Sequence, residues 1–169
     1  MRRILDGLYN GAAALAALCM VGLLLAVLTS IASRQLGFNI SGIDSYAGYL
    51  MAASGFLALA HTLKKGEHIR VTLILAQLRE PARHRLEVWA LFASTLLALL
   101  FAWYSVRLAW QSYDFHDLST NNDATPLWIP QLSMAFGAVI FAIAFIDELV
   151  LELRGQGRPR ESGELLRTE

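Results

Sequence analysis

Lys, Arg, Asp and Glu are absent from four long stretches of this 169-residue chain, and this spacing constrains the fold more than any other feature. The four stretches contain 19 to 27 residues each and cover residues 7–33, 45–63, 88–106 and 124–146. An α-helix rises about 1.5 Å per residue, so about 20 residues cross a hydrocarbon core of about 30 Å. Each stretch is therefore long enough to span a membrane as a helix.

The composition of the stretches favours helices over β-strands. Backbone polar groups inside lipid must bond to one another, which leaves helices and closed β-barrels as spanning structures. Barrel strands alternate polar and apolar residues, whereas ALAALCMVGLLLAVL and LFASTLLALLFAW are apolar on every side and rich in Leu and Ala, which favour helix. The sequence predicts an all-α integral membrane protein, with four transmembrane helices in one domain over residues 1–153.

Basic residues are distributed unevenly among the segments that connect these stretches. Of the 14 Lys and Arg residues, all but Arg34 and Arg107 fall before the first stretch, between the second and third, or after the fourth. By the positive-inside rule, both termini and the segment between the second and third spans are predicted to be cytoplasmic. Residues 154–169 contain few large apolar side chains, and we expect them to form a flexible cytoplasmic tail.

The segment between the second and third spans has a helical pattern of its own. Its apolar residues recur at the spacing of one helix face, and they are Val71, Ile74, Leu75, Leu78 and Ala82. This pattern is too short to span the membrane, so it predicts an amphipathic arm helix over residues 69–80 that lies along the inner interface. A bend is expected at Glu80-Pro81, because proline disrupts the interior of a helix.

The stretch HTLKKGEHIRV, residues 61–71, joins the second span to this arm. Lys64 and Lys65 end the span at the level of anionic headgroups, which attract basic side chains. Gly66 can adopt the left-handed conformation with which helices often end, and Glu67 and His68 can bond to the exposed backbone groups. We interpret the stretch as a corner that fixes the position of the arm. The alternative is a solvated basic loop.

Two further features concern the opposite side of the membrane. Arg34 and Asp44 flank the turn between the first two spans, and we expect them to lie near each other, bonded together or shared with a partner. The alternative is an arginine that extends to the interface alone. Before the fourth span, Thr125 is predicted to be the N-cap, with Pro126 at the first helical position and Pro130 in the first turn or soon after.

The spans offer few groups for transport or catalysis. A pathway for a charged solute needs ionisable groups near the midplane of the bilayer. The main hydroxyls in the spans are expected instead to bond back to their own helices, and they are Thr29, Ser30, Ser54, Ser94, Thr95 and Ser133. A haem subunit needs paired histidines on facing helices, but only His61 lies in a span. We therefore expect no enzyme activity, no cofactor and no nucleic-acid partner. A membrane-anchor or haem-binding subunit of a membrane enzyme complex remains the alternative.

The order of these features resembles the small membrane subunit of tripartite ATP-independent periplasmic (TRAP) transporters, the DctQ-like family. The resemblance is carried by LALAHTLKKGEHIRVTLIL, by Arg34 and Asp44, and by TPLWIPQLSMAFGAVI at the fourth span. It extends over nearly the whole chain to about Leu153. The sequence departs from the family pattern at IDSYAG, where members often have Trp and paired Glu, and at Thr72, where an Asp is common.

The resemblance implies a function that the residues alone do not name. It implies a scaffold in a bacterial inner membrane for a large elevator-type subunit, in sodium-coupled import of an organic acid that depends on a periplasmic binding protein. The implied partners are that large membrane subunit, the periplasmic substrate-binding protein and membrane lipids. The residues expected to have structural or partner-contact roles are Arg34, Asp44, Lys64, Lys65, Gly66, Glu67, His68, Arg70, Ile74, Leu75, Pro126 and Pro130.

Overall fold

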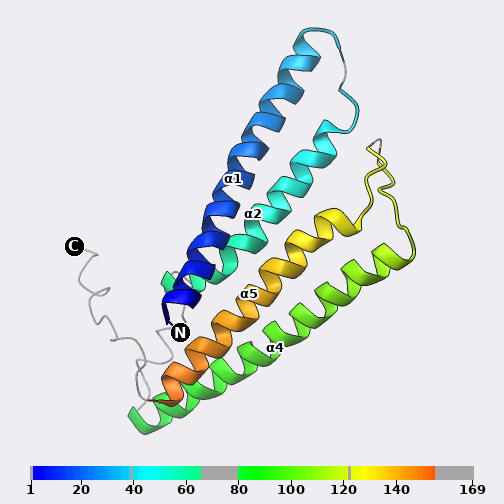
Figure 1. Cartoon of the computed structure of the whole chain (residues 1–169). Helices are drawn as coiled ribbons and strands as arrows, with labels where there is room; N and C mark the ends of the chain where they lie inside the picture. The colour runs from blue at the N-terminus through cyan, green and yellow to red at the C-terminus, as the bar shows by residue number, and fades with distance from the viewer. Residues whose placement is uncertain (1, 39, 66–79, 122, 155–169) are drawn as a thin grey trace, which may run out of the picture.

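The computed structural model describes residues 2–38, 40–65, 80–121 and 123–154 (Figure 1). Four helices make up most of this described part: α1 (Arg2–Gln35), α2 (Ile43–Lys65), α4 (Glu80–Asp114) and α5 (Trp128–Leu153). The only strand-like pairing in the described ranges is an isolated antiparallel bridge between Leu118 and Pro126. The prediction of an all-α protein is confirmed.

Three of the helices contain segments long and apolar enough to cross a membrane. These segments are Leu5–Gln35, His84–Asp114 and Trp128–Leu153. The helix α2 has 23 residues, so its length alone would suffice. Its apolar character is diluted by Tyr46, Tyr49 and His61, and it is not among the three segments.

The four helices lie side by side in a single row, in the order α1, α2, α5, α4 (Figure 1). Extensive contacts join α1 to α2, α2 to α5 and α5 to α4, whereas α1 barely touches α5. The row therefore consists of two antiparallel hairpins, α1–α2 and α4–α5, that meet through α2 and α5. Only the two middle helices have protein on both sides.

Small residues bring the two hairpins together. The buried residues of α5 include Ala135, Gly137, Ala138, Ala142 and Ala144, the type of side chain that lets membrane helices approach closely. The approach is close at Gly137, where a Cβ atom would lie 2.6 Å from the carbonyl carbon and oxygen of Phe56 in α2. Any side chain at this position would push the hairpins apart.

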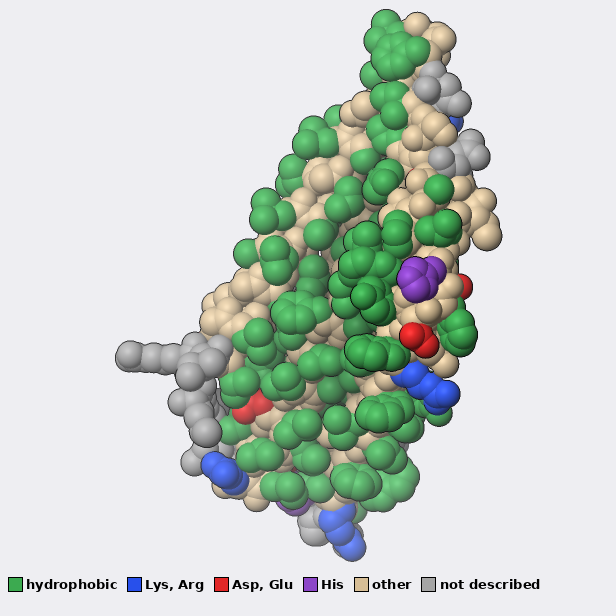
Figure 2. All heavy atoms as spheres, turned by 45° about the vertical axis from the view of Figure 1, so that its right-hand side comes forward, with side chains coloured by type: hydrophobic (Ala, Val, Ile, Leu, Met, Phe, Trp, Pro, Cys, Tyr) green, Lys and Arg blue, Asp and Glu red, His purple; other side chains and the backbone are tan. Residues whose placement is uncertain are grey.

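A row of helices leaves two broad faces uncovered. Hydrophobic side chains cover most of the face drawn in Figure 2, and many of the largest are more than half exposed, including Leu18 and Leu25 in α1 and Leu97 and Trp103 in α4. Contiguous apolar surface of this extent is typical of contact with lipid or with another protein.

The predicted start of the fourth span is wrong in detail. The helix α5 begins at Trp128 with Leu127 as N-cap, and no side chain caps it. Thr125 instead accepts a backbone hydrogen bond from the N–H of Ser119 at 2.8 Å, and Pro126 forms the bridge to Leu118. These bonds within the loop hold both residues outside the helix. Pro130 is the third residue of α5, in the first turn as predicted, where proline is tolerated.

Several predicted features lie outside the described residues. They are the arm over residues 69–80, apart from its last residue Glu80, the corner residues that follow Lys65, and the tail after Arg154. At Glu80-Pro81, where a bend was expected, α4 begins.

Candidate functional site

Polar contacts join the helices at the two ends of the row. We call the end with residues 36–42 and 115–127 the loop end, and the end with Asp6, Lys64 and Glu152 the terminal end. These contacts add to the small-residue packing of α2 against α5.

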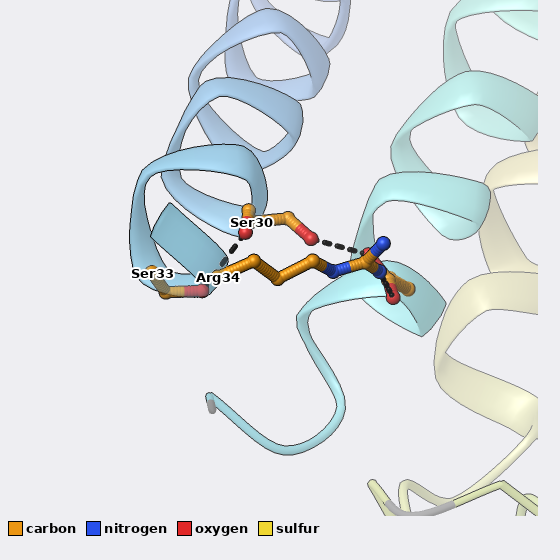
Figure 3. A network of polar contacts seen from close by, with 4 residues as sticks. Ser30, Ser33 and Arg34 are labelled. Atoms are coloured by element: carbon orange, nitrogen blue, oxygen red, sulfur yellow. Dashed lines mark hydrogen bonds and ion pairs between the residues drawn. The ribbon is translucent and has the colours of Figure 1, made fainter. Parts of the chain in front are cut away.

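At the loop end, Arg34 and Asp44 are brought together as the sequence predicted. The guanidinium Nη2 of Arg34 donates to Oδ2 of Asp44 at 2.7 Å, and both side chains are 68% exposed. The Ser30 hydroxyl donates to the other carboxylate oxygen, also at 2.7 Å, and Ser33 donates to the Ser30 carbonyl at 2.9 Å (Figure 3). Both oxygens of Asp44 are therefore bonded to α1, and the hairpin is closed at its turn.

A second network at the loop end joins the two hairpins. Tyr49 of α2 donates its hydroxyl hydrogen to Asp123 Oδ2 at 3.0 Å, and Ser119 donates to Asp123 Oδ1 at 2.8 Å. One turn earlier, the Tyr46 hydroxyl lies 3.0 Å from the Thr125 hydroxyl. We call Tyr46, Tyr49, Ser119, Asp123 and Thr125 the tyrosine latch.

Hydrogen bonding controls the charge of the latch carboxylate. Partial burial alone would raise the pKa of Asp123, but hydrogen bonds from Ser119, Thr125 and Tyr49 outweigh this effect and lower the pKa to about 2. The backbone at Gly42, which has a φ of 84°, lies close to Asp123. A Cβ atom on Gly42 would be 3.0 Å from the Asp123 Cβ. The carboxylate is thus ionised and held against the α1–α2 turn.

The latch was not predicted from the sequence. The sequence places Tyr46 and Tyr49 at the membrane interface, a position typical of aromatic residues in membrane proteins. That position does not predict which groups their hydroxyls will bond. Their spacing of three residues places both on one face of α2. This spacing was the one sequence feature that could have indicated a shared partner for the two hydroxyl groups.

At the terminal end, Lys64 joins α2 to α1. Its ammonium group forms an ion pair with Asp6 and lies 4.6 Å from the centre of the Tyr9 ring. The Tyr9 side chain is almost fully buried against Ala60 and Ile140. The position of the Lys64 ammonium group is therefore held by the Asp6 carboxylate and by the Tyr9 ring.

Another cluster at this end joins α4 to α5. His84 Nδ1 lies 3.4 Å from Glu152 Oε1, and potential ligand atoms of His84, Glu87 and Glu152 all lie within 4.8 Å of one another. One imidazole and two carboxylates could in principle ligate a divalent metal. Because His84 is more than half exposed, the arrangement is equally that of a surface ion pair.

Hydroxyl groups within the helices bond to their own backbones, as predicted. Thr29 donates to Leu25 O, Ser54 to Met51 O and Thr95 to Leu91 O, at 2.7 to 2.8 Å. Ser133 bonds in the same way to Pro130 O. Ser30 instead donates to Asp44, and within the described residues no hydrogen bond is found for Ser94. Hydroxyls bonded in this way offer no free donors to a passing solute.

The remaining predicted residues are distributed as follows. Lys65 is the exposed last residue of α2, and Pro126 and Pro130 lie near the loop end, before and within α5. Six residues lie outside the described part of the chain: Gly66, Glu67, His68, Arg70, Ile74 and Leu75.

Comparison with known proteins identifies the family. Residues 23–155 match the model of the family described as tripartite ATP-independent periplasmic transporters, DctQ component. This match includes the last 13 of the 34 residues of α1 and all of the described residues that follow them. No curated protein matches the sequence. The chain therefore belongs to the DctQ family: it is the small, multi-pass membrane component of a TRAP transporter, a permease subunit in transport that depends on a periplasmic binding protein, and not an enzyme.

Proposed function

We propose that this subunit is a static scaffold for the large, elevator-type subunit in sodium-coupled import of an organic acid. The observation that carries the proposal is the single row of helices with two uncovered apolar faces. A flat layer can cover one side of a larger membrane protein while its other face contacts lipid. The hydroxyls that bond to their own helices favour a supporting role over a solute pathway.

In this proposal α2 is the fourth transmembrane helix. It lies between α1 and α5, so much of its surface faces protein, and it needs less apolar character than a helix surrounded by lipid. Its ends are joined to those of α1 by Arg34–Asp44 at the loop end and Lys64–Asp6 at the terminal end. Because α1 and α2 are paired at both ends, we place α2 at the same depth in the membrane as α1.

The terminal end faces the cytoplasm in the bacterial inner membrane. Four parts of the described chain lie at the terminal end: its first residue Arg2, the end of α2, the start of α4 and its last residue Arg154. Twelve of the 14 basic residues fall in the corresponding segments, as the positive-inside rule requires of a cytoplasmic side. The loop end then faces the periplasm and the substrate-binding protein.

We assign the corner and arm to contact with the large subunit and with lipid at the inner interface. The residues concerned are Gly66, Glu67, His68, Arg70, Ile74 and Leu75, and the support is their basic and amphipathic sequence pattern together with the family match. Replacing His68 with Ala, or Ile74 and Leu75 with Ser, should leave insertion intact but weaken copurification with the large subunit.

A disulfide across the hairpins tests whether the scaffold is static. Cysteines at Gly42 and Asp123, in a Cys19→Ser background, would place their Cβ atoms 3.0 Å apart, so the two positions need to separate by about 0.5 Å to reach the spacing of a disulfide. The variant would be reconstituted with the large subunit and the binding protein, and sodium-driven uptake would be measured before and after reduction. A static scaffold gives equal uptake in the two states. Uptake that is lost on oxidation and recovered on reduction would show that the hairpins move, and uptake by the small subunit alone would contradict the supporting role.

A further inference from the structure

Three side chains that could ligate a metal meet between α4 and α5 at the terminal end. His84 and Glu87 belong to α4 and Glu152 belongs to α5, and one ligand atom from each lies within 4.8 Å of the other two. Within the described part of the chain, no other three residues of these types come together in this way. The cluster combines one imidazole nitrogen with two carboxylate oxygens, so it is not simply an acidic patch.

The helices themselves bring these ligands together. His84 and Glu87 are three positions apart, a spacing that places both on one side of α4. Glu152 lies in the last turn of α5, on the neighbouring helix. Further along the hairpin, buried alanines of α4 pack against buried alanines of α5, which keeps the two helices close. The cluster therefore depends on helix positions and not on the conformation of one side chain.

The distance between His84 and Glu152 fits a shared metal ion better than a hydrogen bond. Nδ1 of His84 and Oε1 of Glu152 are 3.4 Å apart, which is longer than the usual range of about 2.7–3.2 Å for a hydrogen bond from nitrogen to oxygen. Zn²⁺ binds imidazole nitrogen and carboxylate oxygen at about 2.0–2.2 Å with tetrahedral angles, so two of its ligand atoms lie about 3.4 Å apart. The observed separation equals this tetrahedral edge.

The charge of Glu152 also favours a bound cation. Its side chain is only 20% exposed, and it lies at the C-terminal end of a helix, where the helix dipole disfavours negative charge. The last turn of α5 has no basic residue, and the His84 imidazole is a cation only when it is protonated. A largely buried carboxylate that lies beside a second carboxylate is stabilised by a positive ion.

We propose that His84, Glu87 and Glu152 bind a divalent transition-metal ion, for which Zn²⁺ fits best. Mg²⁺ and Ca²⁺ prefer oxygen ligands, whereas an imidazole among the ligands favours Zn²⁺. Three protein ligands leave a fourth position for water. The ion would join α4 to α5 as the Lys64–Asp6 pair joins α2 to α1. The site consists of described residues of this chain alone, so it does not depend on the proposed scaffold function.

Titration of the full chain with Zn²⁺ tests the proposal. The small subunit would be purified without a histidine tag, placed in lipid nanodiscs, treated with a chelator and titrated by isothermal calorimetry. We expect one Zn²⁺ to bind per chain and Mg²⁺ at the same concentrations not to bind. Co²⁺ in the same site should give the strong visible absorption of a tetrahedral complex. Zn²⁺ should also raise the thermal unfolding temperature, because it binds the folded chain.

Two substitutions in the site and two controls outside it identify the ligands. His84→Gln and Glu152→Gln should each weaken Zn²⁺ binding at least about ten-fold, since loss of even an outer partner of a metal ligand costs about 10–100-fold in affinity. His116→Gln and Asp147→Asn change a histidine and an acidic residue outside the cluster, and both should leave the affinity unchanged. Circular dichroism would check that each variant keeps its helical content.

Three results would overturn the proposal. Absence of saturable Zn²⁺ binding in the parent chain would leave His84 and Glu152 as a surface ion pair. Binding that survives His84→Gln would place the ion elsewhere, and equal binding of Mg²⁺ would remove the imidazole from the ligands. Because Zn²⁺ binding is measured on the small subunit and uptake on the whole transporter, failure of the metal site is distinguishable from failure of the scaffold.

Discussion

At the scale of single residues, the loop end depends on two carboxylates with different partners. Asp44 accepts hydrogen bonds from Ser30 and Arg34 of the neighbouring helix. Asp123 accepts them from Tyr49, which is 74 residues away in the sequence, and from Ser119 in its own loop. The first carboxylate closes a hairpin and the second joins two hairpins, so their removal has separate consequences.

We predict that Arg34 and Asp44 are energetically coupled. Both side chains are well exposed, so the effect of each single alanine variant on thermal stability should be small. Arg34→Ala and Asp44→Ala should together destabilise the subunit by less than the sum of their separate effects, because either change removes the same ion pair. Thermal unfolding of the four proteins of the cycle measures this. Strictly additive losses would mean that the contact contributes nothing.

The tyrosine latch should be insensitive to physiological pH. The pKa of Asp123 is lowered from 3.8 to about 2, so its contribution is fully present above about pH 4 and is lost as the pH falls toward 2. Hydrogen exchange of residues 115–127 should therefore be unaffected by the state of this carboxyl between pH 8 and pH 5, once the intrinsic pH dependence is corrected.

An asparagine substitution reproduces the protonated state of the latch at neutral pH. Asp123→Asn should increase hydrogen exchange in the same loop, because an amide carries no charge to attract the three donors. Asp117→Asn is the matched control, since the two hydrogen bonds found for Asp117 use its backbone N–H and its backbone carbonyl. Equal effects of the two substitutions would show that net charge, not the latch, controls the loop.

At the scale of helices, close approach rather than charge determines which helices are neighbours. The helices α2 and α5 meet at Gly137 and at a series of alanines. Without a hydrophobic driving force between helices in lipid, such small residues favour association through close packing. The order of the row therefore depends on a few positions where a side chain would not fit.

Substitution of Gly137 should test this dependence. A Cβ at this position would overlap the Phe56 backbone, so Gly137→Ala should destabilise the subunit by about 1–3 kcal/mol. Gly55→Ala in α2 is the matched control, because nothing lies within 4 Å of its added Cβ. Alanine there should be neutral or stabilise by up to about 1 kcal/mol through helix propensity. Denaturant titration followed by circular dichroism compares the two, and similar effects would contradict close packing at Gly137.

At the scale of the whole molecule, a flat row has no interior of its own. The two outer helices, α1 and α4, each pack mainly against one neighbour, and most of their large apolar side chains are uncovered. The stability of this arrangement therefore depends on what surrounds it, which is lipid on one face and the large subunit on the other in the proposed complex.

The proposed topology makes a prediction for the whole chain. In a Cys19→Ser background, a cysteine at Ser119 should react with a membrane-impermeant thiol reagent applied from the periplasm, because residue 119 lies in the loop between α4 and α5. A cysteine at Ser162 should react only after the membrane is made permeable. The reverse pattern of labelling would invert the orientation.

The sequence by itself determined the helices and the family. Charged side chains are costly inside an apolar span, so each uncharged stretch falls on one of the helices α1, α2, α4 and α5, although α4 extends eight residues beyond its stretch at each end. The motif from LALAHTL onward led to the correct family. The pair Arg34–Asp44 could also be predicted, because only ten residues separate its members in the sequence and both flank one turn.

Only the tertiary structure decided the order of the row, the latch and the start of α5. Tyr46 and Thr125 are 79 residues apart, and no local pattern specifies which helix a hydroxyl group will face. The predicted cap at Thr125 and Pro126 followed a local rule, but the loop between Asp117 and Leu127 is closed by its own hydrogen bonds, which hold those residues outside the helix. A rule for helix starts that considers only adjacent residues gives way where hydrogen bonds across the loop hold those residues in another conformation.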